Sequence, residues 1–151
     1  MDEIGRHHPA HGVHITLREP TIVFLTVCTR GRQPWLACEE ADASLSQIWT
    51  GATAWRVGRY LLMPDHLHLF CAPTDSEISL DAWVRYWKSQ FRRTSGRPDW
   101  RWQTDHWDTR LRRGESYSEK WTYVCENPVR ANLATSAEAW PHQGEIHHLP
   151  W

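Results

Sequence analysis

The sequence has no long hydrophobic run, since none of its apolar stretches approaches the roughly eighteen residues that a membrane-spanning helix needs. The first residues also lack the basic-then-apolar pattern of a secretory signal. No CxxC pair occurs among Cys28, Cys38, Cys71 and Cys125, which excludes the common zinc and redox motifs built on that spacing. We therefore expect a soluble cytoplasmic protein, without a membrane partner, whose cysteines are free thiols in a reducing compartment.

The chain also has little net charge, −1 over 151 residues, so the overall balance indicates neither a polyanion binder nor a membrane-surface protein. The distribution is uneven. Residues 85–113 contain nine of the seventeen lysines and arginines and only three acids, a balance of +6 that leaves −7 for the rest. Such asymmetry indicates contact with nucleic acid, although a solvated helix face has the same composition.

Tryptophan is abundant, with eleven in the chain. Indole rings fill protein cores or stack on unpaired bases. The core role is favoured for any single ring. Trp83, Trp87, Trp100 and Trp102 are nevertheless candidates for base stacking, because they accompany the basic segment.

The length fits a single domain over residues 1–151, with a leader at 1–18 and a tail at 134–151 flanking the core. Periodicity and turn residues predict strands at 21–29, 55–63 and 66–72, helices at 39–54, 79–94 and 117–126, a further helical turn at 128–133, and an extended segment at 100–112. This order predicts an α+β fold, a ferredoxin-like βαββαβ antiparallel sheet with an added C-terminal helix.

Two histidines stand two residues apart in one predicted strand, within Met63-Pro64-Asp65-His66-Leu67-His68-Leu69-Phe70. Alternate side chains of a strand share a face, so His66 and His68 lie side by side while the leucines face the core. Imidazole is a common ligand of transition metals, and the pair is half of a metal site. The motif alone is also compatible with a purely structural role.

Tyr123 and Asn127 are four residues apart and lie on one face of the predicted helix, which Ser116 and Glu119 begin as a capping box. Two imidazoles and an amide oxygen form a plausible set for Mg²⁺ or Mn²⁺, with Tyr123 as a nucleophile beside a phosphate. The alternative is that Asn127 is an ordinary cap before Pro128, and that Tyr123 is a core aromatic with its hydroxyl at the surface.

Two stretches together resemble one known family. They are MPDHLHL at 63–69 and YVCENPVRANL at 123–133. In this order and spacing they are similar to the motifs of the REP-associated tyrosine transposases, relatives of the small single-tyrosine insertion-sequence transposases of the HUH endonuclease superfamily. The resemblance runs from the Phe24-Leu25-Thr26 strand through Trp102-Gln103 to Leu133, over two thirds of the chain.

The resemblance implies a bacterial, nucleoid-associated enzyme, monomeric or homodimeric, that cleaves and rejoins single-stranded DNA near hairpins of repeated extragenic palindromes. By motif matching, His66, His68 and Asn127 are the ligands of Mg²⁺ or Mn²⁺. Tyr123 is the nucleophile, and it forms a 5′-phosphotyrosine and releases a 3′-hydroxyl. The residues that we expect to contact DNA are cationic: Arg85, Lys88, Arg92, Arg93, Arg110, Arg112 and Arg130.

The sequence departs from the family pattern at three places. Asp65 stands where Asn or Glu is frequent, Thr109 where His is frequent, and Asn132 where Gly is common. None of them is one of the four proposed site residues. Two other functions stay open: a domesticated relative that binds DNA hairpins or single strands without cutting, and a metal-dependent hydrolase that uses the two histidines with water.

Overall fold

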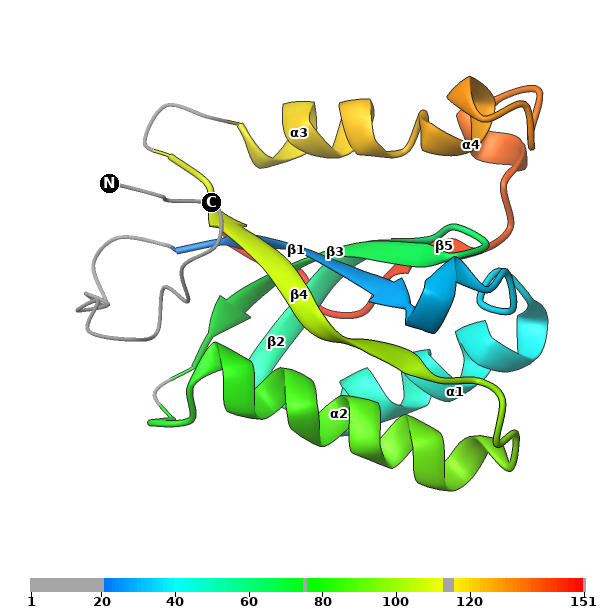
Figure 1. The fold of residues 1–151 in the computed structure, drawn as a ribbon. Coiled ribbons are helices and arrows are strands. Elements are labelled where there is room, and N and C mark those ends of the chain that lie inside the picture. The colour runs from blue at the N-terminus through cyan, green and yellow to red at the C-terminus, as the bar shows by residue number, and fades with distance from the viewer. Residues whose placement is uncertain (1–20, 75, 113–115, 151) are drawn as a thin grey trace.

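The computed structural model describes residues 21–74, 76–112 and 116–150, and its elements follow the predicted order (Figure 1). The helices and strands are β1 Val23–Thr29, α1 Glu39–Gly51, β2 Trp55–Leu62, β3 His66–Pro73, α2 Leu80–Ser95, β4 Trp102–Arg110, α3 Tyr117–Val124, α4 Asn127–Arg130 and β5 Gln143–Glu145. Two 3-10 helices, η1 Arg30–Arg32 and η2 Ala137–Ala139, lie between them. Within these described ranges, no helix has both the length and the apolar character for crossing a membrane.

The five strands form one antiparallel sheet in the order β4-β1-β3-β2-β5. The first four have the arrangement of a ferredoxin-like βαββαβ chain, with the first and third strands in the centre. β1 suits a central position because its run of β-branched and aromatic residues contains no strand breaker. The predicted α+β class and ferredoxin-like sheet are confirmed.

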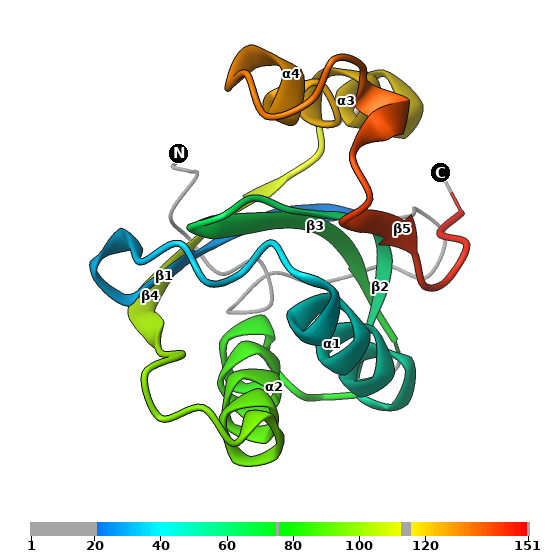
Figure 2. The ribbon, with the colours of Figure 1, turned by 90° about the vertical axis from the view of Figure 1, so that its right-hand side faces the viewer.

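α1 and α2 cover one face of the sheet (Figure 2). Indole rings fill much of the space between them, with Trp49 and Trp87 in an edge-to-face contact at 5.5 Å. Trp83, Trp87 and Trp100 are buried, and Trp102 packs half-buried against the same cluster. The core role of these four tryptophans is confirmed.

Side-chain caps fix where two helices begin. The Ser79 hydroxyl accepts a hydrogen bond from the Ala82 amide at the start of α2, and Gly96, in the left-handed region at φ 68°, ends that helix. At the start of α3 the Ser116 hydroxyl accepts from the Glu119 amide, which is one half of the predicted capping box.

α3 and α4 form a second helical layer on the opposite face of the sheet (Figure 1). This layer contacts the sheet through Phe70, whose ring lies 4.9 Å from that of Tyr117 and 6.3 Å from that of Trp121. Val124 is buried in the same small cluster. The sheet therefore has a helical layer on each face, one in contact with the leucines of β3 and one on the side of the histidines.

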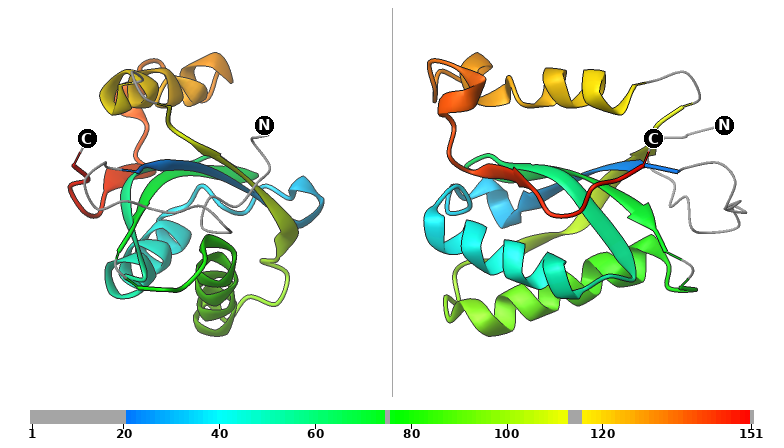
Figure 3. Two further views of the ribbon diagram at one scale, coloured as in Figure 1. Left: turned by 90° about the vertical axis from the view of Figure 1, so that its left-hand side faces the viewer. Right: turned by 180° about the vertical axis from the view of Figure 1, so that it is seen from behind.

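The segment after Ala134 contributes more than the flanking tail that the sequence indicates. β5 pairs with β2 at the sheet edge, and the last described residues continue along that edge (Figure 3). Leu149 is buried, and the Trp140 indole donates a hydrogen bond to the Leu62 carbonyl. A three-residue strand is too short to produce a hydrophobic alternation, which is why the sequence gives no sign of it.

Candidate active site

His66 and His68 lie side by side on β3, with ring centroids 4.9 Å apart. Leu67 and Leu69 alternate with them and are fully buried against α1 and α2. The pleat of the strand thus separates the two kinds of side chain as the sequence predicts. We call the surface that carries His66, His68, Phe70 and their β1 neighbour Thr26 the histidine face.

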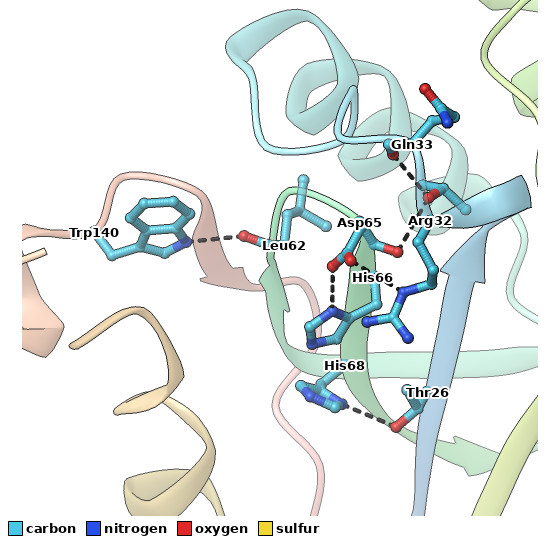
Figure 4. A network of polar contacts seen from close by, with 9 residues as sticks. Thr26, Arg32, Gln33, Leu62, Asp65, His66, His68 and Trp140 are labelled. Carbon is cyan, nitrogen blue, oxygen red and sulfur yellow. Dashed lines mark hydrogen bonds and ion pairs between the residues drawn. The ribbon is translucent and has the colours of Figure 1, made fainter. Parts of the chain in front are cut away.

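Each imidazole is held by its Nδ1 atom (Figure 4). His66 Nδ1 donates to Asp65 Oδ1 at 2.8 Å, and His68 Nδ1 lies 2.9 Å from the Thr26 hydroxyl oxygen. That hydroxyl can accept a hydrogen bond from Nδ1–H, which leaves the lone pair of the ring on Nε2. A second partner on Nδ1 is the usual arrangement around histidines that ligate a metal through Nε2.

Asp65 is itself fixed by its surroundings. Burial opposes its ionisation, but hydrogen bonds from His66 and from Arg32 Nε, at 3.0 Å, hold its pKa below the usual value. The Asp65 carbonyl accepts from both the amide and the hydroxyl of Thr29, at 3.0 and 3.1 Å. The turn before β3 is thereby attached to the end of β1, and the carboxylate keeps its position beside His66.

His68 is strongly biased to its neutral form. Burial, followed by electrostatic interactions with His66, Lys120 and Arg130, lowers its pKa to about 3. Phe24 stacks on the His68 ring at 5.1 Å, and the Lys120 ammonium lies 5.2 Å from the Phe24 ring. Lys120 and Arg130 belong to α3 and α4, so this helical layer lies close enough to act on the histidines.

Tyr123 and Asn127 come from the layer over the histidine face, but Arg130 holds both. Tyr123 is 64% exposed, and the Arg130 guanidinium lies 4.3 Å from its ring centroid. Asn127 Oδ1 accepts from Arg130 Nη2 at 3.2 Å, while its Nδ2 donates to the Val124 carbonyl. Among the described residues, neither side chain forms a hydrogen bond with an imidazole.

The donor set fits a divalent ion in part. The two imidazoles are held through Nδ1, and their Nε2 atoms are left for a ligand. Nitrogen ligands of this kind suit a transition ion such as Mn²⁺ better than Mg²⁺, which prefers oxygen. The predicted third ligand, Asn127 Oδ1, already accepts a hydrogen bond from Arg130. Within residues 21–74, 76–112 and 116–150, no three His, Cys, Asp or Glu side chains form a metal-binding group, so a third ligand from these ranges would have to be another kind of group, such as an amide or hydroxyl oxygen.

α2 carries Arg85, Lys88, Arg92 and Arg93, and we call it the basic helix. It lies on the far side of the sheet from the histidines (Figure 2). Arg92 and Arg93 are exposed there, and Arg85 pairs with Asp81 at 2.7 Å. Lys88 Nζ donates to the carbonyls of Gln103 and Thr104, and burial lowers its pKa to about 8. A phosphate contact by Lys88 would have to replace these bonds.

The other predicted DNA contacts are divided between two places. Arg110 and Arg112 are exposed at and just beyond the end of β4, whereas Arg130 lies over the histidine face.

The sequence reasoning missed cations near the histidines. Arg32 holds Asp65, Lys120 lies over Phe24, and Arg59 of β2 lies 5.6 Å from the Trp121 ring. They were missed because the charge count singles out only residues 85–113. The Arg30-Gly31-Arg32 sequence directly after the first strand was the available signal.

The structure explains one departure from the family pattern and locates another. Asn132 has φ 60°, in the left-handed region that suits glycine and that asparagine tolerates better than most residues. Thr109 pairs with Phe24 in the sheet register, so it lies on the histidine face at the edge strand.

Searches with protein-family models and against curated proteins find no match. Among solved structures, the chain is similar to a REP-associated tyrosine transposase bound to a REP hairpin, with TM-score 0.70 and 21% identity over 95% of this chain and 82% of that one. It is also similar to a candidate transposase from Deinococcus radiodurans, with TM-score 0.51 and 21% identity over 72% of this chain and 91% of that one. The chain therefore shares the fold of a REP-associated tyrosine transposase, the family that its two motifs resemble.

Proposed function

We propose that this protein is a tyrosine transposase that nicks and rejoins single-stranded DNA beside hairpins. The observation that carries the proposal is the histidine pair, in which Asp65 and Thr26 engage Nδ1 and leave Nε2 for a ligand. The shared fold with a hairpin-bound transposase supports DNA as the partner.

In the proposed reaction the Tyr123 oxygen forms a bond to the phosphorus of a DNA phosphodiester. The bond from phosphorus to the 3′-oxygen breaks, the tyrosine hydroxyl loses its proton, and the 3′-oxygen takes one up. The products are a 5′-phosphotyrosine and a free 3′-hydroxyl. Attack by another 3′-hydroxyl reverses these changes, so rejoining needs no external energy source.

His66, His68 and Asn127 would hold a divalent ion, which when bound withdraws charge from the phosphate oxygens. Asp65 and Thr26 orient the two imidazoles, and the buried leucines of β3 keep the strand rigid. Arg130 donates to Asn127 Oδ1, and its positive charge beside that oxygen opposes a cation there, so Arg130 would move away when Asn127 acts as a ligand. Because Arg130 also covers the Tyr123 ring, one movement of its side chain frees both residues.

The proposal is tested by mixing the protein, Mn²⁺ and a labelled hairpin with single-stranded flanks, followed by denaturing electrophoresis. Hairpins are taken from palindromic repeats that flank the gene. Wild type should form a protein–DNA adduct, and Tyr123→Phe should form none. Tyr86→Phe is the matched control because Tyr86 is also exposed, at 52%, but lies on α2. Equal amounts of adduct from wild type and from Tyr123→Phe would contradict the proposal.

The second candidate is a DNA-binding protein that does not cut. The contacts of Arg130 with Tyr123 and Asn127 favour it, because they keep the nucleophile and the third ligand engaged. This candidate predicts hairpin binding without an adduct, both in the wild type and in Arg130→Ala. The hydrolase alternative predicts cleavage that survives Tyr123→Phe without any adduct.

A further inference from the structure

One tryptophan differs from the others in its exposure. Of the ten tryptophans in the described ranges, only Trp107 belongs to the exposed residues, at 37%. It lies in the middle of β4, the strand at one edge of the sheet. A single exposed apolar side chain is ordinary by itself, so the role of Trp107 depends on what lies beside it.

The sheet register places Trp107 on the histidine face. Thr26 of β1 pairs with His68 on one side and with Trp107 on the other. Directly paired residues of neighbouring strands point to the same face, so His68, Thr26 and Trp107 form one row across the sheet. Two strand spacings separate the ends of that row, about 10 Å.

The orientation of Trp107 is fixed by its neighbours along β4. Asp108 is 1% exposed, and the His106 side chain is also buried, 3.3 Å from Asp108. Both point to the α2 side, because their partners on β1, Leu25 and Val27, belong to the core on that side. The alternation of the strand then holds the indole of Trp107 on the opposite face.

Among the described residues, the helical layer does not extend over this end of the face. Figure 2 shows α3 and α4 above the β3 and β2 side of the sheet, away from β4. A planar group of a ligand can thus contact Trp107 while an adjacent group of the same ligand lies at the histidines. Lys120 and Arg130 make the surroundings of the histidines cationic, which favours a polyanion over an apolar peptide as the ligand.

We propose that Trp107 is a stacking platform for an unpaired base of the DNA strand whose phosphate lies at His66 and His68. The inference rests on the proposed function and names one contact of its substrate. Base stacking on indole is tolerant of sequence, so the platform would position the strand without reading it.

The test uses a fluorescein-labelled hairpin with and without an oligo-dT extension, and anisotropy at fixed salt without Mn²⁺. Trp107→Leu should weaken binding to the extended hairpin about tenfold, within the range of one stacked base, and should leave the hairpin without extension unaffected. Trp107→Phe retains an aromatic face and should stay within about threefold of wild type. Tyr86→Leu, an exposed aromatic on α2, is the matched control and should change neither affinity.

Abasic nucleotides then locate the contact. One abasic position in the extension should weaken wild type by the same factor as Trp107→Leu and should not weaken the variant further. Equal binding of wild type and Trp107→Leu, or equal losses on both hairpins, would overturn the inference and leave the proposed function standing. A changed oligomeric state with unchanged DNA binding would make Trp107 a contact between copies, which also overturns it. If wild type binds neither hairpin, the proposed function and the inference fall together.

Discussion

The two faces of the sheet are built from different kinds of side chain. In the described part of the chain, twenty buried residues form the cluster under α1 and α2, against eight in the cluster under α3 and α4. The first face is filled with leucines and interlocked tryptophans. The histidine face instead carries hydrogen-bonded imidazoles, stacked rings and cations. Since apolar burial is the dominant favourable contribution to folding, the first face contributes more to the stability of the molecule, and the second face is the one on which the proposed chemistry would take place.

This difference also bears on motion. α3 and α4 together contribute few buried side chains, among them Tyr117, Val124 and Pro128. A layer held by so few contacts can shift more easily than α1 and α2. We therefore expect Tyr123 and Asn127 to approach the histidines through a shift of α3 and α4, and not through a change in the sheet.

The largest effect is expected from the histidines themselves. His66→Ala or His68→Ala should reduce cleavage of a hairpin-flanked strand by about a thousandfold or more, because each removes a proposed metal ligand. Hairpin affinity, measured by anisotropy, should change little. If affinity is lost together with cleavage, the two residues are structural and the contrast between the faces disappears.

Truncation of one tryptophan on each face compares their packing directly. Trp87→Ala should lower the free energy of unfolding by about 3–5 kcal/mol, because it empties a fully buried site. Trp121→Ala, on the half-buried helical layer, should cost only about 1 kcal/mol. Urea denaturation measures both. Equal losses would show that the α3 layer is as firmly packed as α1 and α2.

Asp65→Asn tests whether the neighbours of the imidazoles prepare them for a metal. Loss of the carboxylate beside His66 should weaken Mn²⁺ binding about tenfold to a hundredfold, as measured by electron paramagnetic resonance of free Mn²⁺. Asp81→Asn, which removes a carboxylate on the α2 side, is the control. An unchanged Mn²⁺ affinity in Asp65→Asn would show that the contact between Asp65 and His66 stabilises the turn before β3 and does not affect metal binding.

The smallest effect concerns the basic helix. If DNA reaches both faces, the double variant Arg92→Ala, Arg93→Ala should reduce the slope of log affinity against log salt by about 2. Lys120→Ala, over the histidine face, should reduce it by about 1. A slope unchanged only in the double variant would confine DNA to the histidine face.

Much of the fold followed from local patterns. The breaker-free run of β1, the alternation of leucine and histidine in β3 and the cap at Ser79 each determine structure within a few residues. The motifs predicted a site with residues from β3 and from the last helices, and the site itself stays a prediction.

What the sequence did not predict depends on contacts between distant segments. The charge count located a basic segment but not the face on which α2 would place it, because that depends on sheet topology. Trp107 was indistinguishable from the core tryptophans until its register with Thr26 was known. The contacts of Arg130 with Tyr123 and Asn127 depend on rotamers, which spacing does not specify.

The central claim is that Tyr123 forms the covalent bond to DNA, and peptide mapping of the adduct tests it most directly. Trypsin cleavage after Lys120 and Arg130 yields a peptide, residues 121–130, whose single tyrosine is Tyr123. Mass spectrometry of the adduct after nuclease digestion should find a nucleotide phosphate on this peptide alone. A phosphate on a peptide containing Tyr60, Tyr86 or Tyr117, or a cleaved strand with no modified peptide, would contradict the account.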